Sequence, residues 1–147
     1  MVDMPEDNSL FQRIEWLDAL NTDHAEIDDD HRQLIDDTNI ILAVLALDRP
    51  WAELIELVLQ MRANCVAHFR REEQILAHED YPDITGHAAE HRRIEQELAK
   101  VVDDLAEIPN PSPPARELAL YFRSLLLNHF LRYDLRYKSH LLYKAGR

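Results

Sequence analysis

The stretch HFRREEQILAHEDYPDITGHAAEH, residues 68 to 91, predicts the end of one helix, a tight turn and the start of a second helix that runs back. Asp80 to Asp83 have the composition of a turn, and Asp83 is placed to cap the second helix. Apolar residues at three- and four-residue spacing mark one face of the first helix: Leu54, Leu57, Val58, Met61, Cys65, Phe69 and Leu76. We therefore expect an antiparallel helix pair, from about residue 51 to the turn and from about 83 to 107.

Two more helices are predicted on either side of this pair. Apolar residues with a helical period predict one helix over about residues 24 to 47 and another over about 115 to 142. Residues 48 to 50 and the proline-rich segment 108 to 114 are expected to be connectors. Four long helices with short connections predict an all-α protein, an up-down-up-down antiparallel four-helix bundle.

The first 22 residues show no helical period. We expect an extended N-terminal arm over residues 1 to 22 that packs Phe11, Ile14 and Trp16 on the bundle, which then spans residues 23 to 147.

Composition excludes several classes of function. The formal net charge of -12 disfavours binding to nucleic acid or to anionic lipid. No apolar stretch is long enough to insert into a membrane, and the N-terminus lacks the features of a signal peptide. A single cysteine excludes an internal disulfide, so a cytoplasmic location is the default expectation. Nothing in the composition identifies a protein partner.

Five of the eight histidines fall on or near the apolar sides of the predicted helices: His31, His68, His87, His91 and His129. His68 and Glu72 are four residues apart, as are His87 and His91, so each pair projects from one helix face. Either pair alone is weak support for a metal site, because a lone histidine is more often a surface or a satisfied core residue. Candidates from all four helices at interior positions, however, favour a metal centre in the bundle.

The donor set narrows the choice of metal. A single zinc site would need four ligands, usually with thiolates, and Cys65 stands alone. Five imidazoles and two carboxylates exceed the needs of one ion, but they suit two first-row ions bridged by carboxylates and by a solvent-derived oxygen. Two irons are the natural occupants. Neutral imidazoles disfavour deep oxidation of the metal, which suits reversible O2 binding better than oxygenase chemistry.

His129 and Asp134 are five residues apart, which in a regular helix separates their directions by about 140°. Asp134 then has to reach round from the flank of the helix, or the helix has to widen locally into a π turn. The flank is the favoured expectation. His24, His78 and His140 are expected at the surface, as are the acidic residues of the run from Asp28 to Asp30.

Four stretches resemble the hemerythrin family, including the bacterial hemerythrins, over about residues 14 to 143. They are WLDALNTDHAEIDDDHRQL (16 to 34), HFRREE (68 to 73), YPDITGHAAEH (81 to 91) and LLNHFLRYD (126 to 134). They are similar, in order and spacing, to the family's tryptophan arm, its H-F-x-x-E-E helix, its Y-P turn with H-x-x-x-H, and its N-H-I-x-x-x-D helix.

The resemblance implies a ligand assignment. His87, His91 and His129 would bind one iron, His31 and His68 would bind the other, and Glu72 and Asp134 would bridge the two together with an oxo or hydroxo group. The two-histidine iron would keep the open position that binds O2. By the same alignment, the O2 pocket would be lined by Leu34, Phe69, Leu125 and Leu126. Leu125 departs from the family, which commonly has tryptophan at that position, so we expect a pocket that water reaches more easily.

The favoured function is therefore reversible O2 binding at a non-haem di-iron centre for oxygen storage, delivery or sensing, rather than an enzyme. Two alternatives stay open. One is an iron-handling protein or an enzyme acting on peroxide or nitric oxide, although such relatives often lack the complete ligand pattern. The other is a sensory input module, against which the sequence offers only the expectation that the chain ends soon after Leu142, without an output domain.

Overall fold

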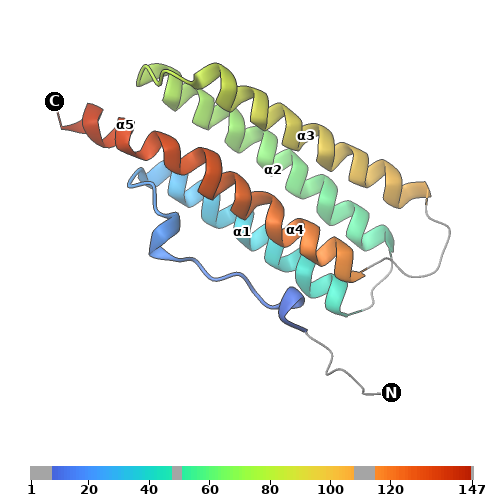
Figure 1. Cartoon of the computed structure of the whole chain (residues 1–147). Helices are drawn as coiled ribbons and strands as arrows, with labels where there is room; N and C mark the ends of the chain where they lie inside the picture. Colours follow the sequence, from blue (N-terminus) through green and yellow to red (C-terminus); the bar gives the residue numbers. More distant parts are fainter. Residues whose placement is uncertain (1–7, 48–50, 108–114, 147) are drawn as a thin grey trace.

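The computed structural model describes residues 8 to 47, 51 to 107 and 115 to 146. Within these ranges the long helices lie side by side (Figure 1) and form four rods. They are α1 (Ala25–Ala46), α2 (Trp51–His78), α3 (Ile84–Glu107) and a rod in which α4 (Ala115–His129) leads into α5 (Leu135–Ala145). α1 packs against α2 and α4, and α2 packs against α3. The predicted all-α, up-down-up-down antiparallel four-helix bundle is confirmed, and its predicted connectors lie outside the described residues.

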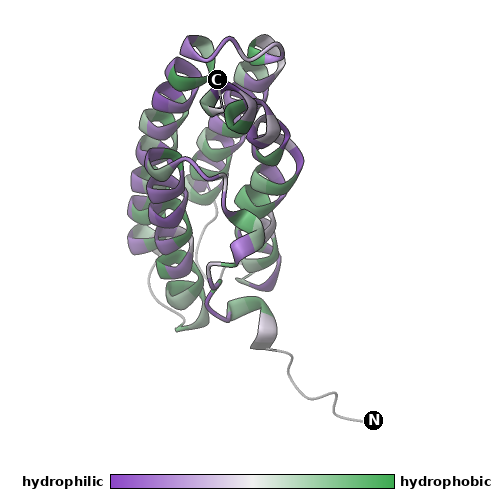
Figure 2. Ribbon diagram, turned by 90° about the vertical axis from the view of Figure 1, so that its left-hand side faces the viewer, coloured by the Kyte–Doolittle hydropathy of each residue, from purple (hydrophilic) through white to green (hydrophobic). Residues whose placement is uncertain are grey.

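Hydrophilic and hydrophobic residues alternate along each helix, as amphipathic packing requires (Figure 2). A large apolar cluster contains Leu34, Phe69, Ile94 and Phe130, among others. A smaller apolar cluster is formed by buried Ile27, Leu76, Tyr137 and Leu141. On α1, α2 and the last rod, buried polar residues lie between members of the two clusters, so a polar layer crosses the bundle between two apolar regions. No helix in the described ranges combines the length and apolar character needed to cross a lipid bilayer.

The described part of the N-terminal arm lies along the bundle. Ile14 donates its backbone N–H to the Asn39 side chain (2.7 Å), and Asn39 donates back to the Ile14 carbonyl (3.0 Å). Ile14 is buried, Phe11 and Trp16 pack against the large apolar cluster, and the Arg32 guanidinium lies 4.4 Å from the Trp16 ring centre. The predicted packing of Phe11, Ile14 and Trp16 is therefore confirmed. The division between an arm (1 to 22) and a bundle (23 to 147) stays a prediction.

Two local devices set the start of α1. His24 has an extended backbone and its Nδ1 accepts the Ile27 backbone N–H (3.4 Å), so it is the N-cap. The buried Asp28 carboxylate accepts hydrogen bonds from the Thr22 backbone N–H (2.9 Å) and hydroxyl (2.8 Å). These contacts fix where α1 begins and therefore where its later side chains point.

The tight turn between α2 and α3 joins the two helices that carry the paired motifs. Asp80 lies in the left-handed region with φ of 54°, and the Tyr81 N–H donates to the Leu76 carbonyl (2.9 Å). A Cβ at Gly86 would lie 2.6 Å from the Asp83 carboxylate. Because glycine has no side chain, the Asp83 carboxylate can lie over the first turn of α3. The turn thus sets the register of α3 against α2.

Between α4 and α5 the last rod contains a π-helical turn, Phe130–Asp134. The Leu135 N–H donates to the carbonyl of Phe130, five residues back, instead of four. This extra residue brings Asp134 to the inner face that His129 occupies, and Asp134 is fully buried. The expectation that Asp134 reaches in from the flank of a regular helix was therefore wrong, because the backbone itself widens.

Candidate metal centre

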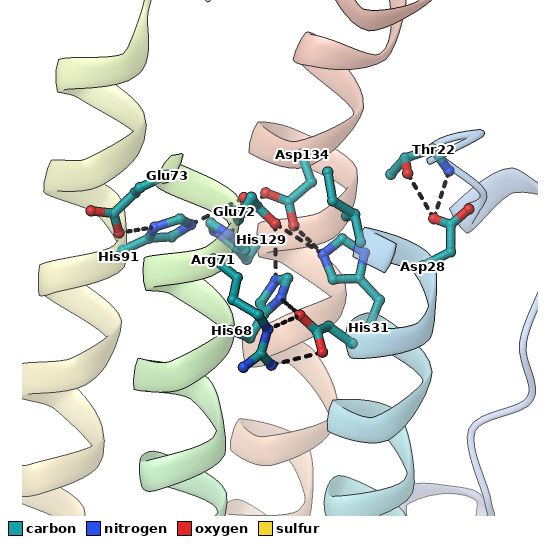
Figure 3. Close-up of polar contacts among 12 residues, drawn as sticks. Thr22, Asp28, His31, His68, Arg71, Glu72, Glu73, His91, His129 and Asp134 are labelled. Carbon is teal, nitrogen blue, oxygen red and sulfur yellow. Dashed lines mark hydrogen bonds and ion pairs between the residues drawn. The ribbon is translucent and has the colours of Figure 1, made fainter. Parts of the chain in front are cut away.

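All seven residues predicted as ligands are at most 2% exposed. Figure 3 shows His31, His68, Glu72 and Asp134 pointing toward one another from α1, α2 and the last rod. Burying this many ionisable side chains in a bundle is costly unless they are paired or bind metal. Their donor atoms fall into two groups, one of five residues and one of three.

The larger set, called here the three-histidine group, consists of Glu72, His87, His91, His129 and Asp134. One donor atom from each lies within 4.8 Å of all the others. His87 Nε2 and His129 Nε2 are each 3.0 Å from Asp134 Oδ1, and His91 Nε2 is 3.3 Å from Glu72 Oε1. The group therefore joins α2, α3 and the last rod.

The smaller set, called here the two-histidine group, consists of His31, His68 and Glu72. Glu72 Oε2 lies 3.3 Å from His31 Nε2 and 2.9 Å from His68 Nε2. Asp134 Oδ2 also lies 3.1 Å from His31 Nε2. Glu72 thus offers one oxygen to each group, and Asp134 places its two oxygens beside imidazoles of both.

Several of these close contacts are not hydrogen bonds. Both Asp134 oxygens and the Nε2 atoms of His68, His91 and His129 are buried without a hydrogen-bond partner within the described ranges. These nitrogen and oxygen atoms lie about 3 Å apart without sharing a proton, which would be unfavourable in an empty site. A metal ion between them would explain the arrangement, because their lone pairs would then point at the ion. The residues present therefore fit a pair of bound metal ions. No thiolate belongs to either group, which disfavours a structural zinc site.

The electrostatics of the candidate metal centre are dominated by its two carboxylates, Glu72 and Asp134. Burial alone would raise the pKa of Glu72, but its close polar contacts with four imidazoles hold that pKa well below its usual value. Burial alone would lower the pKa of His31, but Asp134 and Glu72 raise it to about 10, and the same carboxylates raise the pKa of His87 to about 9. Protons thus compete with metal ions for these nitrogens.

Asp30 supports the two-histidine group from outside. Its carboxylate lies 3.0 Å from His68 Nδ1 and is held by two charge-assisted hydrogen bonds from Arg71, at 2.8 and 2.7 Å. With Nδ1–H donating to Asp30, the His68 Nε2 is left free to bind a metal. Figure 3 shows Arg71 beside His68 in this arrangement.

Glu73 has the corresponding role on the other side. Its Oε2 lies 2.8 Å from His91 Nδ1, and Arg92 donates to its Oε1 at 2.7 Å. The Nδ1–H of His91 donates to Glu73, which leaves Nε2 free inside the three-histidine group. One imidazole of each group therefore has a carboxylate behind it.

Neither supporting carboxylate was predicted from the sequence. The prediction that the run from Asp28 to Asp30 is exposed was wrong for Asp28 and Asp30, because both bond to buried partners. Of the three, only Asp29 has an exposed side chain. Each supporting carboxylate directly adjoins a ligand, Asp30 before His31 and Glu73 after Glu72, yet it serves a histidine on another helix. Their position next to a predicted ligand was the sequence signal that could have identified these two carboxylates.

Aromatic rings hold imidazoles in place on the large apolar side. Phe130 stacks on His31 with ring centres 4.1 Å apart, and Phe69 stacks on His91 at 4.0 Å. The four predicted O2-pocket residues, Leu34, Phe69, Leu125 and Leu126, are all buried and belong to one apolar cluster. Their grouping on this side of the polar layer is compatible with an apolar pocket.

Leu125 also lines an outer groove between α3 and α4. The groove has a volume of about 400 Å³, and its walls include Arg93, Glu97 and Tyr121. Neither Trp16 nor Phe11 of the N-terminal arm lines this groove. Leu125 is 8% exposed and separates the groove from the interior.

The other histidines lie outside both groups. His24 caps α1, His78 is exposed at the end of α2, and the His140 side chain bonds the Glu79 carbonyl. Cys65 is buried, and burial raises the pKa of its thiol to about 12, so it is an inert core residue.

Comparison with known proteins agrees with this geometry. A crystal structure of a hemerythrin with one leucine replaced by alanine aligns with a TM-score of 0.75 at 22% identity, covering 87% of this chain and 96% of that one. A search of curated proteins found no match. The family model for the hemerythrin HHE cation binding domain matches residues 22–141, which is most of the chain. The chain therefore belongs to the hemerythrin family.

Proposed function

We propose that the protein binds O2 reversibly at a non-haem di-iron centre, for oxygen storage, delivery or sensing. The observation that carries the proposal is the arrangement of seven buried donors in two groups that share Glu72. Five imidazoles against two carboxylates give a donor set of low negative charge, which suits first-row ions that change oxidation state by one unit. Two irons, when bound, would supply the electrons on which reversible O2 binding depends.

The ligand assignment follows the two groups. His87, His91 and His129 would hold one ion, His31 and His68 the other, and Glu72 and Asp134 would bridge them, with an oxo or hydroxo group completing the pair. The ion held by two histidines has fewer protein ligands, so it would keep the open position for O2. Leu34, Phe69, Leu125 and Leu126 would exclude water from that position.

Two features of the chain support a binding protein rather than an enzyme. The donors are buried, and each supported imidazole is fixed by a carboxylate held by arginine, which favours a rigid centre. The centre also lies in a layer enclosed by apolar clusters on both sides. We further propose a cytoplasmic protein without nucleic-acid or membrane partners, on the basis of its net charge of -12 and its single cysteine.

The test is an absorption experiment on the iron-loaded, reduced protein. Spectra are taken without O2, after O2 is added and after O2 is removed, with the iron content measured in the same sample. We expect about two irons per chain and a visible band that appears with O2 and disappears when O2 is removed. A band that bleaches irreversibly, or consumption of O2 or peroxide with turnover, would instead establish an iron-handling protein or an enzyme.

A further inference from the structure

Tyr137 is a buried tyrosine that the ligand assignment leaves without a role. It is 0% exposed and lies on α5, three residues after Asp134, in the small apolar cluster with Ile27, Leu76 and Leu141. Its ring centre is 5.4 Å from that of His87, so it borders the three-histidine group directly. A phenylalanine would fill the same space with no polar atom to satisfy.

The Tyr137 hydroxyl is the unusual feature. It is buried and makes no hydrogen bond of regular geometry within the described ranges, although the Glu72 carboxylate is close enough to interact with it. A buried hydroxyl without a partner destabilises the fold, so its presence needs a reason. Burial raises its pKa well above the usual value, and the negative charges of Asp134 and Glu72 raise it further. The phenol therefore stays protonated, and the Glu72 carboxylate is the acceptor within its reach.

We propose that Tyr137 is a positioning residue of the metal centre, whose hydroxyl donates a hydrogen bond to the Glu72 carboxylate when Glu72 bridges the two ions. This inference rests on the proposed di-iron function. Glu72 comes from α2, whereas Tyr137 comes from α5, so the bond ties the bridge to the rod that also carries Asp134. The Tyr137 ring borders His87, a member of the three-histidine group, so the hydroxyl would act on the bridging carboxylate from that side.

Tyr121 supplies a matched control. Its hydroxyl is also buried without a partner within the described ranges, and burial raises its pKa to about 12. It lies on α4 in the wall of the groove beside Leu125, two helical turns before His129, and it belongs to neither donor group. Removing either hydroxyl deletes the same atom from a buried position, but only Tyr137 has the Glu72 carboxylate beside it.

The experiment compares wild type, Tyr137→Phe and Tyr121→Phe, each as the full chain. Three quantities are measured: the melting temperature of the metal-free protein, the rate at which an iron chelator removes bound iron, and the charge-transfer absorption of the oxidised centre. We expect Tyr137→Phe to leave the metal-free melting temperature unchanged or higher, to release iron about 10-fold faster and to shift the charge-transfer bands. We expect Tyr121→Phe to match wild type in iron release and in spectrum.

The outcomes separate this inference from the function it rests on. If wild type binds fewer than two irons, the proposed function and this inference are both overturned. If wild type binds two irons but Tyr137→Phe releases them at the wild-type rate with an unchanged spectrum, only the role of Tyr137 is overturned. Equal acceleration in both tyrosine variants also overturns it, since that result would reflect general loosening of the bundle.

Discussion

The two donor groups of the polar layer are built differently. The three-histidine group takes His87 and His91 from adjacent turns of α3, so part of its geometry is local to one helix. The two-histidine group takes His31 from α1 and His68 from α2, so its imidazoles meet only if those helices pack in register. Both groups depend on Glu72. The comparison teaches that one side of the centre is largely preformed by helix geometry, and the other is an outcome of tertiary packing.

The largest expected effect removes what the groups share. Replacing Glu72 with alanine should empty both groups, because its two oxygens contact imidazoles of each and metal binding contributes folding free energy. We expect iron content to fall from about two to below one per chain. The control is His24→Ala, which removes the α1 cap at a cost of about 1 kcal/mol but no ligand. Equal iron in Glu72→Ala and wild type would contradict a shared bridge.

The supporting carboxylates distinguish the two groups. Asp30→Ala and Glu73→Ala should each weaken metal binding by about 10- to 100-fold, since each frees the Nδ1–H of one imidazole. Asp30→Ala should release the ion of the two-histidine group more readily than Glu73→Ala releases the other ion, because the two-histidine group has fewer remaining ligands to hold its ion. Stepwise release of iron to a chelator measures this difference, with Asp29→Ala as the exposed control. If Glu73→Ala lost iron more readily than Asp30→Ala, the preformed side would be the weaker one.

The metal-free protein should show a pH dependence set by the same contacts. The pKa values of His31 and His87 in the folded state are about 10 and about 9, above the unfolded value of about 6.5. The two histidines therefore stabilise the fold fully below pH 6.5, and this contribution is lost as the pH rises from 6.5 to 10. Glu72 and Asp134 have lowered pKa values, so they stabilise the fold above about pH 4, and this contribution is lost as the pH falls below that value. Melting temperatures should therefore be highest between about pH 4 and 6.5 and fall by about 5 °C or more at pH 9. A melting temperature that rises from pH 6 to 9 would show that these histidines are neutral in the metal-free fold.

A smaller effect is expected where the polar layer approaches solvent. Leu125 stands where the family commonly has tryptophan and separates the outer groove from the interior. Leu125→Trp should slow oxidation of the O2-bound protein about twofold to fivefold, a barrier change of no more than about 1 kcal/mol, because a larger side chain excludes water better. Oxidation of both proteins is followed at one pH and temperature. A tryptophan variant that oxidises as fast as wild type would show that Leu125 already seals the site.

The smallest effect is expected from deleting Leu131. This exposed leucine lies inside the π turn, which holds one residue more than a regular turn. Deletion should restore a regular helix with His129 and Asp134 four apart, so Asp134 and Tyr137 keep their inward faces. We expect unchanged iron content and a melting temperature within about 5 °C of wild type. Iron loss as severe as in Glu72→Ala would mean that the π turn itself shapes the ligand geometry.

The sequence alone determined the helical architecture and which side chains could be donors. Periodic apolar residues and turn composition are local signals, and they predicted the four rods and the turn between α2 and α3 close to their observed bounds. The pairs His68 with Glu72 and His87 with His91 follow from the helical repeat alone, and the motifs carried the resemblance to a family that the comparisons then identified.

Only the tertiary structure decided how those donors meet. The support that Asp30 gives to His68 and Glu73 gives to His91 depends on which helices become neighbours, and no periodicity within one helix reports it. The π turn at Phe130–Asp134 gives up regular helical hydrogen bonds and places Asp134 on the inner face. Whether this exchange is favourable depends on the packing around the metal centre, which the local sequence does not report. The sequence does not distinguish a tyrosine with an exposed hydroxyl from Tyr137, whose hydroxyl is buried, because burial is a property of the assembled bundle.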